Sequence, residues 1–390
     1  MPESKSTIQT AIPESKGSDE FSQLEQQFLY PDSINERFDI WLDFIRTVSV
    51  DEKIFFTQNL GVMLKSGLSA SRALRTLVLQ ATNPKFKRAL FKIFRDVEKG
   101  QPIAQAMEAF PKVFSSLYVN MIRAGEAAGQ LEEVLTELTR QMKRSHELKQ
   151  KVRGAMMYPT AIMIAMVSIG TGMVVFIIPK LISIFRDLNA TLPLPTRILI
   201  GFSDWVNANI YVVGPLAIIL SGSLVYATKR GPGQRIWHRL VLILPIVKNI
   251  VKKINLARIA RTLGSLLKTD MPIVKSLTLT GSTIKNVHYK QSLFTMSESI
   301  EKGKTISSEM AEYPKLYPPV VQQMIAVGEE TGEIDNILTQ LAEFYEDDVS
   351  QTMDSLPSLI EPVLIVLMGV AIGGMAVAII LPMFTLTQTV

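Results

Sequence analysis

The chain has 390 residues, of which 47% are apolar and 20% charged, and its formal net charge is +5. With a mean hydropathy of +0.22, this apolar share is high for a soluble protein, and the charged share is too large for a chain made only of membrane spans. The mixture predicts spans alternating with water-exposed helices. The sequence has no cysteine and only three widely separated histidines. Disulfides and cysteine nucleophiles are therefore excluded, and we expect no metal site.

The first 50 residues contain two kinds of sequence. Up to about Gln27 the chain is rich in Ser, Glu, Gln and Lys, a composition that predicts a disordered tail. Farther on, the pattern predicts a short helix with four large apolar side chains on one face: Phe38, Trp41, Leu42 and Ile45. Two interpretations of this helix stay open: it lies on the membrane surface, or it docks onto the domain that follows.

Three windows of the sequence are long enough to cross a bilayer, which takes about 20 apolar residues. Their apolar centres lie at 160–178, 210–227 and 363–381. Backbone groups in lipid must be paired within the membrane-spanning structure, so we expect each window to be a helix.

Basic residues are distributed unequally around these windows. Many precede the first window and follow the second, only Lys180, Arg186 and Arg197 lie between those two, and none follows the third. Basic flanking segments stay on the cytoplasmic side, so we expect a cytoplasmic N-terminus and an external C-terminus. The excess positive charge then faces anionic lipid, and no nucleic-acid partner is expected.

An internal repeat covers most of the chain. A shift of 203 residues aligns 55–187 with 258–390 without a gap. Turn-forming residues coincide at this shift, such as Pro111 with Pro314 and Gly129 with Gly332. Shared glycines and prolines indicate shared helix ends, so we interpret the repeat as a duplication.

Each copy of the repeat is expected to be helical, because apolar residues recur at intervals of three and four. Breakers at 83–84, 100–102 and 110–111 divide a copy into about six helices. The expected fold class is all-α: a polytopic membrane protein with two duplicated cytoplasmic helical bundles and three transmembrane helices. The expected order is a tail with a short helix (1–50), the first cytoplasmic domain (51–157), the first span (158–179), a short external loop (180–208), the second span (209–228), a basic cytoplasmic connector (229–257), the second cytoplasmic domain (258–357), the third span (358–382) and an external tail (383–390).

A possible nucleotide-binding motif occurs at Gly303-Lys304-Thr305. A phosphate-binding loop needs a glycine five positions before its Gly-Lys pair, but that position holds Glu298, and the context is helical. We interpret Gly303 as a glycine that ends a helix. No catalytic, cofactor-binding or metal-binding residue is predicted.

The most distinctive polar feature is a motif present in both copies. It reads Gly125-Glu126-Ala127-Ala128-Gly129 in the first copy and Gly328-Glu329-Glu330-Thr331-Gly332 in the second. One interpretation is a tight connection between helices, in which glycines allow a positive φ or a close approach. The other is a charged contact surface for a partner. Carboxylate catalysis would need a second acid or base beside the glutamate, and the sequence indicates none.

The entrances to the first and third windows carry matching prolines. Tyr158-Pro159 precedes the first window, and Glu361-Pro362 opens the third, which ends near Pro382. A proton relay through Glu361 would need further acids deeper in the span, and 362–390 contains none. An interfacial role, structural or in coupling, is therefore favoured.

Together these residues resemble the inner-membrane platform proteins of type IV pili and type II secretion systems, the PilC/GspF family. Members carry two related helical domains, each with a Gly-Glu-x-x-Gly-x-Leu/Ile signature, which here begins at Gly125 and at Gly328. They also carry a Tyr-Pro before the first span and a Glu-Pro that opens the last, with a proline that closes it. The resemblance covers about Asp51 to the C-terminus.

The resemblance implies a non-enzymatic platform in the inner membrane that binds a cytoplasmic assembly ATPase and passes its motion to pilins or pseudopilins. Other inner-membrane machine components are expected partners, a homo-oligomer is expected, and no cofactor is. Residues 1–50 do not resemble the leading domain of many secretion-type members, so pilus and secretion roles both stay open. A membrane transporter component and an ATP-hydrolysing enzyme are the alternatives from other classes.

Overall fold

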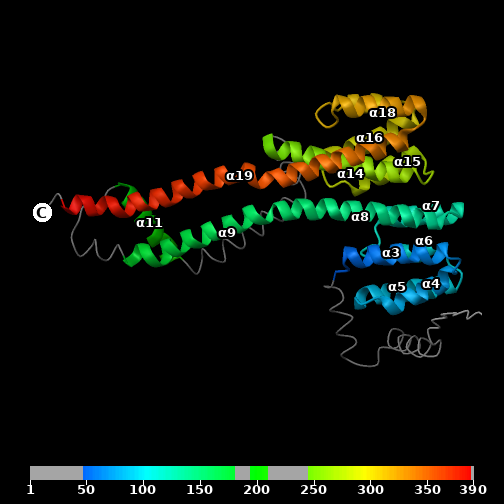
Figure 1. The fold of residues 1–390 in the computed structure, drawn as a ribbon, viewed down its shortest axis with the longest axis horizontal. Helices are drawn as coiled ribbons and strands as arrows, with labels where there is room; N and C mark the ends of the chain where they lie inside the picture. The colour runs from blue at the N-terminus through cyan, green and yellow to red at the C-terminus, as the bar shows by residue number, and fades with distance from the viewer. Residues whose placement is uncertain (1–46, 181–193, 210–244, 388–390) are drawn as a thin grey trace, which may run out of the picture. The chain divides into compact units, whose positions relative to one another are not determined.

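The computed structural model describes residues 47–180, 194–209 and 245–387. Helices make up all the regular structure in these ranges, which confirms the all-α prediction (Figure 1). The expected short helix at 38–45, nearly all of the second span, the first part of the connector and the end of the C-terminal tail lie outside the described residues.

The first copy of the repeat forms a series of helices whose starts are explained by local capping. Ser49 makes a capping box with Glu52 at the start of the first helix, and Asn83 accepts hydrogen bonds from the backbone N–H groups of Lys85 and Phe86 before another. The helices are α3 (Val50–Lys65), α4 (Ala70–Gln80), α5 (Pro84–Glu98), α6 (Ile103–Glu108), α7 (Ser116–Ala128) and α8 (Leu131–Ala155).

The second copy forms a matching series. Asn286, the counterpart of Asn83, caps its helix with the same two hydrogen bonds, and Gly100 and Gly303 share a φ of +87° just after equivalent helices. Helix ends therefore coincide at the shift of 203 residues that the sequence shows. The helices are α14 (Pro245–Leu267), α15 (Ile273–Thr283), α16 (Val287–Glu301), α17 (Ile306–Ala311), α18 (Pro319–Thr331) and α19 (Ile334–Thr387).

The chain divides into two compact units that do not coincide with the two copies. Unit 1 comprises the residues up to Arg144 together with Thr262–Thr283, and unit 2 comprises Ser145–Arg261 together with residues from Ile284 onward. The end of α14 and all of α15 therefore belong to the second copy by sequence and to unit 1 by packing. The domain bounds expected from the sequence, 51–157 and 258–357, follow the duplication rather than this packing.

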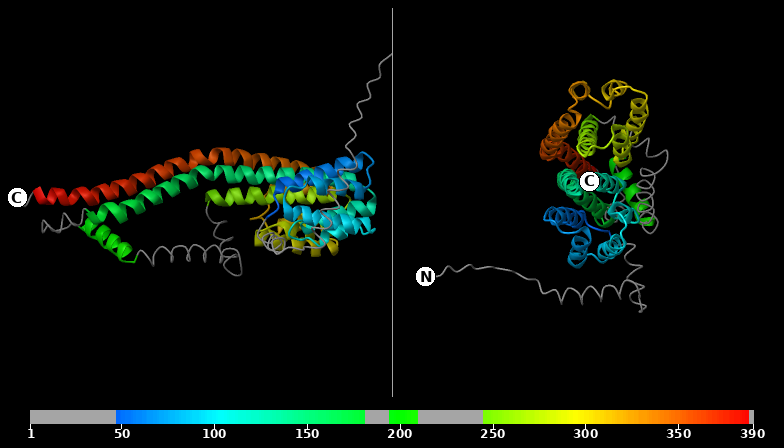
Figure 2. Two further views of the ribbon diagram at one scale, coloured as in Figure 1. Left: turned by 90° about the horizontal axis from the view of Figure 1, so that it is seen from below. Right: turned by 90° about the vertical axis from the view of Figure 1, so that its right-hand side faces the viewer.

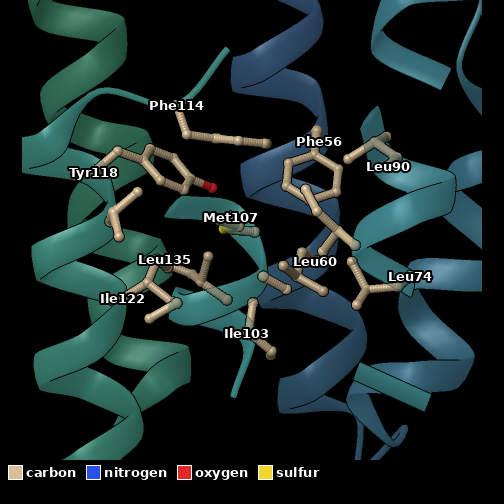
Figure 3. Close-up of a cluster of buried hydrophobic side chains, with 14 of the residues drawn as sticks. Phe56, Leu60, Leu74, Leu90, Ile103, Met107, Phe114, Tyr118, Ile122 and Leu135 are labelled. Atoms are coloured by element: carbon tan, nitrogen blue, oxygen red, sulfur yellow. The ribbon is translucent and has the colours of Figure 1, made fainter. Parts of the chain in front are cut away.

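The core of unit 1 is a cluster of aromatic and aliphatic side chains between its helices (Figure 3). The rings of Phe56 and Phe86 meet edge to face, with centroids 5.6 Å apart. Tyr118 is buried among them, and its hydroxyl lies 3.0 Å from the Thr57 hydroxyl, so this polar group is satisfied. Leu266 and Met271 of the second copy are buried in the same cluster.

Unit 2 repeats part of this core with polar additions. Tyr289 and Tyr317 occupy the positions of Phe86 and Phe114, and their rings meet edge to face at 5.8 Å. Each added hydroxyl has a partner: Tyr289 donates to the Leu316 carbonyl at 3.0 Å, and the Tyr317 hydroxyl lies 2.8 Å from that of Ser292. The two copies thus differ by added hydroxyl groups in the second core, and each added hydroxyl comes with a hydrogen-bond partner.

Two helical stretches, Leu131–Lys180 and Ile334–Val377, are long and apolar enough to cross a membrane. The first contains α9 (Met157–Gly172) and a short π-helix, η1 (Met173–Ile177). α9 and α19 run side by side (Figure 2). Their outward side chains include exposed apolar residues, such as Ile164 at 61% and Val370 at 70%, as expected of a lipid-facing surface.

The range expected to form a short external loop, 180–208, contains a helix. α11 (Leu194–Ala208) packs against α19 and η1. The Ser203 hydroxyl donates to the Val174 carbonyl at 2.7 Å, which pairs a carbonyl inside the π-helix. The loop was expected from the position of this range between two apolar windows, and that position does not reveal α11.

Candidate functional site

The two glycines of the first-copy motif allow a sharp connection between α7 and α8. Gly129 follows α7 with a φ of +70°, a conformation that favours glycine, and the Gln130 N–H donates to the Gly125 carbonyl at 2.8 Å. A Cβ on Gly125 would lie 2.7 Å from Cγ2 of Val134. α8 therefore starts against α7 at a distance that only glycine permits.

The second-copy motif has the same backbone geometry. Gly332 follows α18 with a φ of +77°. A Cβ on Gly328 would lie 3.2 Å from both the Ile334 Cα and the Ile337 Cγ1. The interpretation of the glycines as parts of a tight helix connection fits both copies.

Glu126 of the first motif caps a neighbouring helix. Its two carboxylate oxygens accept the backbone N–H groups of Ile103 at 2.5 Å and Ala104 at 2.9 Å, at the start of α6. The residue before α6 is Pro102, which supplies no side-chain cap. Glu126 therefore replaces the missing N-cap and places a negative charge at the positive end of the helix.

Glu329 does the same in the second copy. It accepts the backbone N–H groups of Ile306 at 2.5 Å and Ser307 at 3.0 Å, at the start of α17, and also the Ser307 hydroxyl. In both copies the glutamate and the residue whose N–H it accepts are 22 or 23 positions apart in the sequence. We call the six residues that share this arrangement the helix lock: Gly125, Glu126, Gly129, Gly328, Glu329 and Gly332.

The helix lock fastens three consecutive helices in each copy. The glutamate joins the middle helix (α7 or α18) to the start of the short helix before it (α6 or α17). The glycines allow the middle helix to pack closely against the long helix after it (α8 or α19). The glutamate oxygens accept hydrogen bonds from backbone N–H groups, so they hold helices together. The exposed part of the motif lies beside the glutamate, at Ala127 and Ala128 in one copy and at Glu330 and Thr331 in the other.

The segment 303–305 connects two helices. Gly303 has a φ of +87°, and the Thr305 hydroxyl accepts the Ser308 N–H at the start of α17. The Lys304 ammonium donates to the Glu309 carboxylate at 2.6 Å. That hydrogen bond raises the pKa of Lys304 and lowers that of Glu309. The interpretation of Gly303 as a helix-ending glycine is confirmed.

An ion pair joins α8 and α19 just before the apolar segment of each helical stretch. The Lys151 ammonium lies 3.2 Å from the Asp354 carboxylate. The pair lines a groove of about 530 Å³ whose other walls include Glu147, Gly154 and Pro357. Lys151 is one of the basic residues that precede the first window, and nothing in the local sequence indicates its partner in the other copy.

The prolines at the ends of the two apolar segments lie inside helices. Pro159 is buried in the first turn of α9, where its missing N–H removes no helical hydrogen bond, and Tyr158 beside it is exposed. Glu361 and Pro362 are exposed within α19. Since proline has no N–H, the carbonyl four residues before Pro362 loses its helical partner, although the helix continues. α19 also continues past Pro382, the expected end of the span, to Thr387.

Two further ion pairs join α14 to the part of α19 that precedes its apolar segment. The Arg261 guanidinium binds the Glu346 carboxylate through two hydrogen bonds, of 2.9 and 2.6 Å, with the Arg261 side chain only 6% exposed. The Lys253 ammonium lies 2.7 Å from Asp348. The sequence shows charges of opposite sign on these two helices. It does not indicate which of them pair across 85 to 95 residues.

The comparisons with known proteins agree with this architecture. The family model of the type II secretion system (T2SS), protein F, matches the chain twice, over residues 56–179 and 259–382. The two matches are offset by the same 203 residues as the internal repeat, which supports the interpretation of duplication.

Curated relatives extend over most of the chain. It is 32% identical over 337 residues to the type IV pilus assembly protein PilC of Myxococcus xanthus, with 86% of this chain and 81% of the relative covered. It is 35% identical over 334 residues to PilC of Thermus thermophilus (86% and 82%). It is 30% identical over 353 residues to the type II secretion system protein F of Pseudomonas aeruginosa (90% and 86%). The resemblance to the PilC/GspF family is confirmed, and with its two apolar helices the protein is an inner-membrane protein. The chain belongs to the family of type II secretion system protein F.

Proposed function

We propose that this protein is a non-enzymatic inner-membrane platform of a type IV pilus or type II secretion machine, and that it couples a cytoplasmic assembly ATPase to the movement of pilins or pseudopilins. The relatives named for pilus assembly and for type II secretion support both versions of this role. The observation that carries the proposal is α19, a single helix of 54 residues that contains both a polar stem, from Ile334 to Glu361, and an apolar segment after it.

A helix of this length is suited to transmit movement. At 1.5 Å per residue it is about 80 Å long, so a displacement of its stem reaches the membrane without crossing a loop. The buried Arg261–Glu346 pair and the Lys253–Asp348 pair fix the stem to α14. The helix lock at Gly328, Glu329 and Gly332 ties the start of α19 to α17 and α18.

The partner surface is proposed to lie on the exposed face of α18 rather than on the helix-lock glutamate itself. Val320 and Val327 are 50% and 52% exposed and lie seven residues apart, two turns along one face. Glu330 continues this face beside the motif. In the first copy the corresponding positions hold Leu117, Ala124 and Ala127, so the two copies differ here. An apolar face with a charged end fits a protein partner.

The proposal is tested by co-purification with the assembly ATPase from the same cells. Val320→Asp together with Val327→Asp should reduce ATPase retention and leave the helical content unchanged. Lys315→Asp, at an exposed position of the same domain, is the matched control. Equal retention in the double variant and the control would remove the α18 face from the contact surface.

The non-enzymatic part of the proposal has its own test. Both helix-lock carboxylates accept backbone hydrogen bonds, and Lys304 is paired with Glu309. The purified protein should therefore hydrolyse no ATP or GTP above a buffer control, and it should not raise nucleotide-independent solute flux in proteoliposomes. Turnover by the protein alone would contradict the proposal.

The membrane arrangement is also proposed from charge. Three spans with a cytoplasmic N-terminus and an external C-terminus follow from the basic residues that flank the first and second windows. Alkaline phosphatase fused after Val390 should be active, because that enzyme needs an external location. Activity of a cytoplasmic reporter at the same place would reverse the arrangement. A homo-oligomer, as expected of a machine base, is testable by cross-linking in the membrane.

A further inference from the structure

Unit 1 carries an apolar groove at the point where the chain enters its first described helix. The groove has a volume of about 470 Å³ and lies between the start of α3, the end of α4 and the first half of α5. Its apolar walls come from Phe55, Phe56, Leu77, Phe86 and Leu90. Phe55 is 53% exposed, an unusual state for a phenylalanine in a domain with a well-packed core.

The chain just before α3 is held close to this groove. Val48 packs against the core of unit 1, and the Thr47 carbonyl accepts a hydrogen bond from the Asn83 side chain at 3.3 Å. Glu52 holds the same corner, accepting from the Asn83 N–H at 3.2 Å and the Thr82 hydroxyl at 3.1 Å. Residues before Thr47 therefore begin beside Thr82 and Asn83, at the groove's edge.

The sequence before Thr47 contains a segment whose apolar side chains could fill this apolar groove. Phe38, Trp41, Leu42 and Ile45 recur at helical spacing, and Asp39 and Asp43 lie next to them on a helical projection. Ile45 is six positions before Asp51, which lines the groove. An extended chain spans at most about 3.5 Å per residue, so the segment starts within about 20 Å of the groove and its binding is an intramolecular event.

From these observations we propose that residues 38–45 dock into this groove, with the apolar face of Phe38, Trp41, Leu42 and Ile45 against the exposed Phe55 side chain. The sequence alone left a choice between docking and the membrane surface, and the groove is the feature that favours docking. The inference is independent of the proposed function, since it concerns packing within one unit.

Tryptophan fluorescence provides the test. The chain has three tryptophans, so Trp205→Phe and Trp237→Phe leave Trp41 as the single reporter. The full chain is placed in nanodiscs, and the emission maximum of Trp41 and its quenching by acrylamide are measured. A docked Trp41 should emit at short wavelength and resist acrylamide. Nanodiscs with brominated lipids should not quench it.

Two variants with a matched control decide the outcome. Phe55→Asp should shift the Trp41 emission to longer wavelength and lower the ratio of docked to undocked segment roughly tenfold or more, as loss of a buried aromatic contact would. Leu42→Asp should do the same from the other side of the contact. Val62→Asp changes a residue of α3 that is 57% exposed and outside the groove, and should have no effect.

Three results would overturn the proposal. Quenching by brominated lipid with protection from acrylamide would place the segment on the membrane. Full acrylamide access in the parent protein would show that the segment does not dock. Equal responses of the Phe55 and Val62 variants would show that Trp41 is protected elsewhere. Phe55 and Val62 are both exposed on one helix, so neither change should unfold the domain, and circular dichroism checks this.

Discussion

Lys151 and Asp354 occupy the same position in the two copies of the repeat, and their side chains form an ion pair at 3.2 Å. A residue that meets its own counterpart lies on a local axis of two-fold symmetry, as in an isologous interface. With identical copies, like charges would meet at this point. Duplication within one chain permits lysine in one copy and aspartate in the other, so the axis carries attraction.

This ion pair predicts a charge-swap result. Both side chains are at least half exposed, so the pair should contribute only about 0.2–1 kcal/mol to the free energy of unfolding. Lys151→Asp or Asp354→Lys alone should remove this and add a repulsion, and the two changes together should restore most of it. Thermal unfolding of the parent and these three variants at low and high salt gives the coupling energy. Lys149→Asp, exposed on the same helix, controls for charge alone, and equal losses in the Lys151→Asp and Lys149→Asp variants would contradict the pairing.

Gly125 of the helix lock and Gly154 of α8 predict opposite signs for the same substitution. Gly125→Ala places a methyl group 2.7 Å from Val134 Cγ2, so it should lower the free energy of unfolding by about 1–3 kcal/mol through overpacking. Gly154→Ala, inside α8 with nothing within 4 Å, should raise it by up to about 1 kcal/mol through helix propensity. Chemical denaturation in detergent measures both changes. Similar values for the two variants would exclude close packing as the reason for Gly125.

The helix-lock glutamates predict a loss of capping. Glu126→Ala leaves the N–H groups of Ile103 and Ala104 without their acceptor and should cost about 1–2 kcal/mol. Glu329→Ala should cost at least as much, because Glu329 also accepts the Ser307 hydroxyl. Hydrogen exchange at residues 103–104 and 306–307 should accelerate in the matching variant only. Glu98→Ala, at an exposed position at the end of α5, should leave both sites protected.

Features that depend on neighbouring residues could be predicted from the sequence, and features that depend on distant ones could not. Asn83, Gly100 and their counterparts define helix ends through their own backbone chemistry, so the repeat and its helix boundaries could be inferred. Glu126 was recognised as important, but its acceptor role depends on a helix 22 residues away. The residues of α15 bear no mark in the sequence that assigns them to unit 1, since packing rather than duplication decides that.

The buried tyrosines predict alkaline sensitivity. Burial raises the pKa values of Tyr118, Tyr289 and Tyr317 above the ordinary value of 10.0. The folded state therefore keeps protons that the unfolded state releases, so this stability is complete below about pH 10 and falls as the pH rises beyond it. Denaturation between pH 8 and pH 11 should show the fall. Tyr118→Phe should reduce its slope, because it removes one of the three groups whose pKa is raised. The Thr57 hydroxyl keeps a partner in this variant, since it donates to the Lys53 carbonyl at 2.7 Å. An unchanged slope would mean that Tyr118 ionises as readily in the folded protein as in the unfolded one.

The Arg261–Glu346 pair predicts the largest single effect on the α19 stem. Both side chains are nearly inaccessible and joined by two hydrogen bonds, so Glu346→Ala leaves a buried guanidinium charge without its carboxylate and should cost about 3–5 kcal/mol. Arg261→Met with Glu346→Leu removes both charges together and should cost much less, because apolar side chains of similar length fill the space. If the proposed coupling through α19 is correct, the single variant should also impair pilus assembly or secretion more than the double variant. An equal defect in both would mean that the charges themselves, rather than the fixed position of the stem, are what the machine requires.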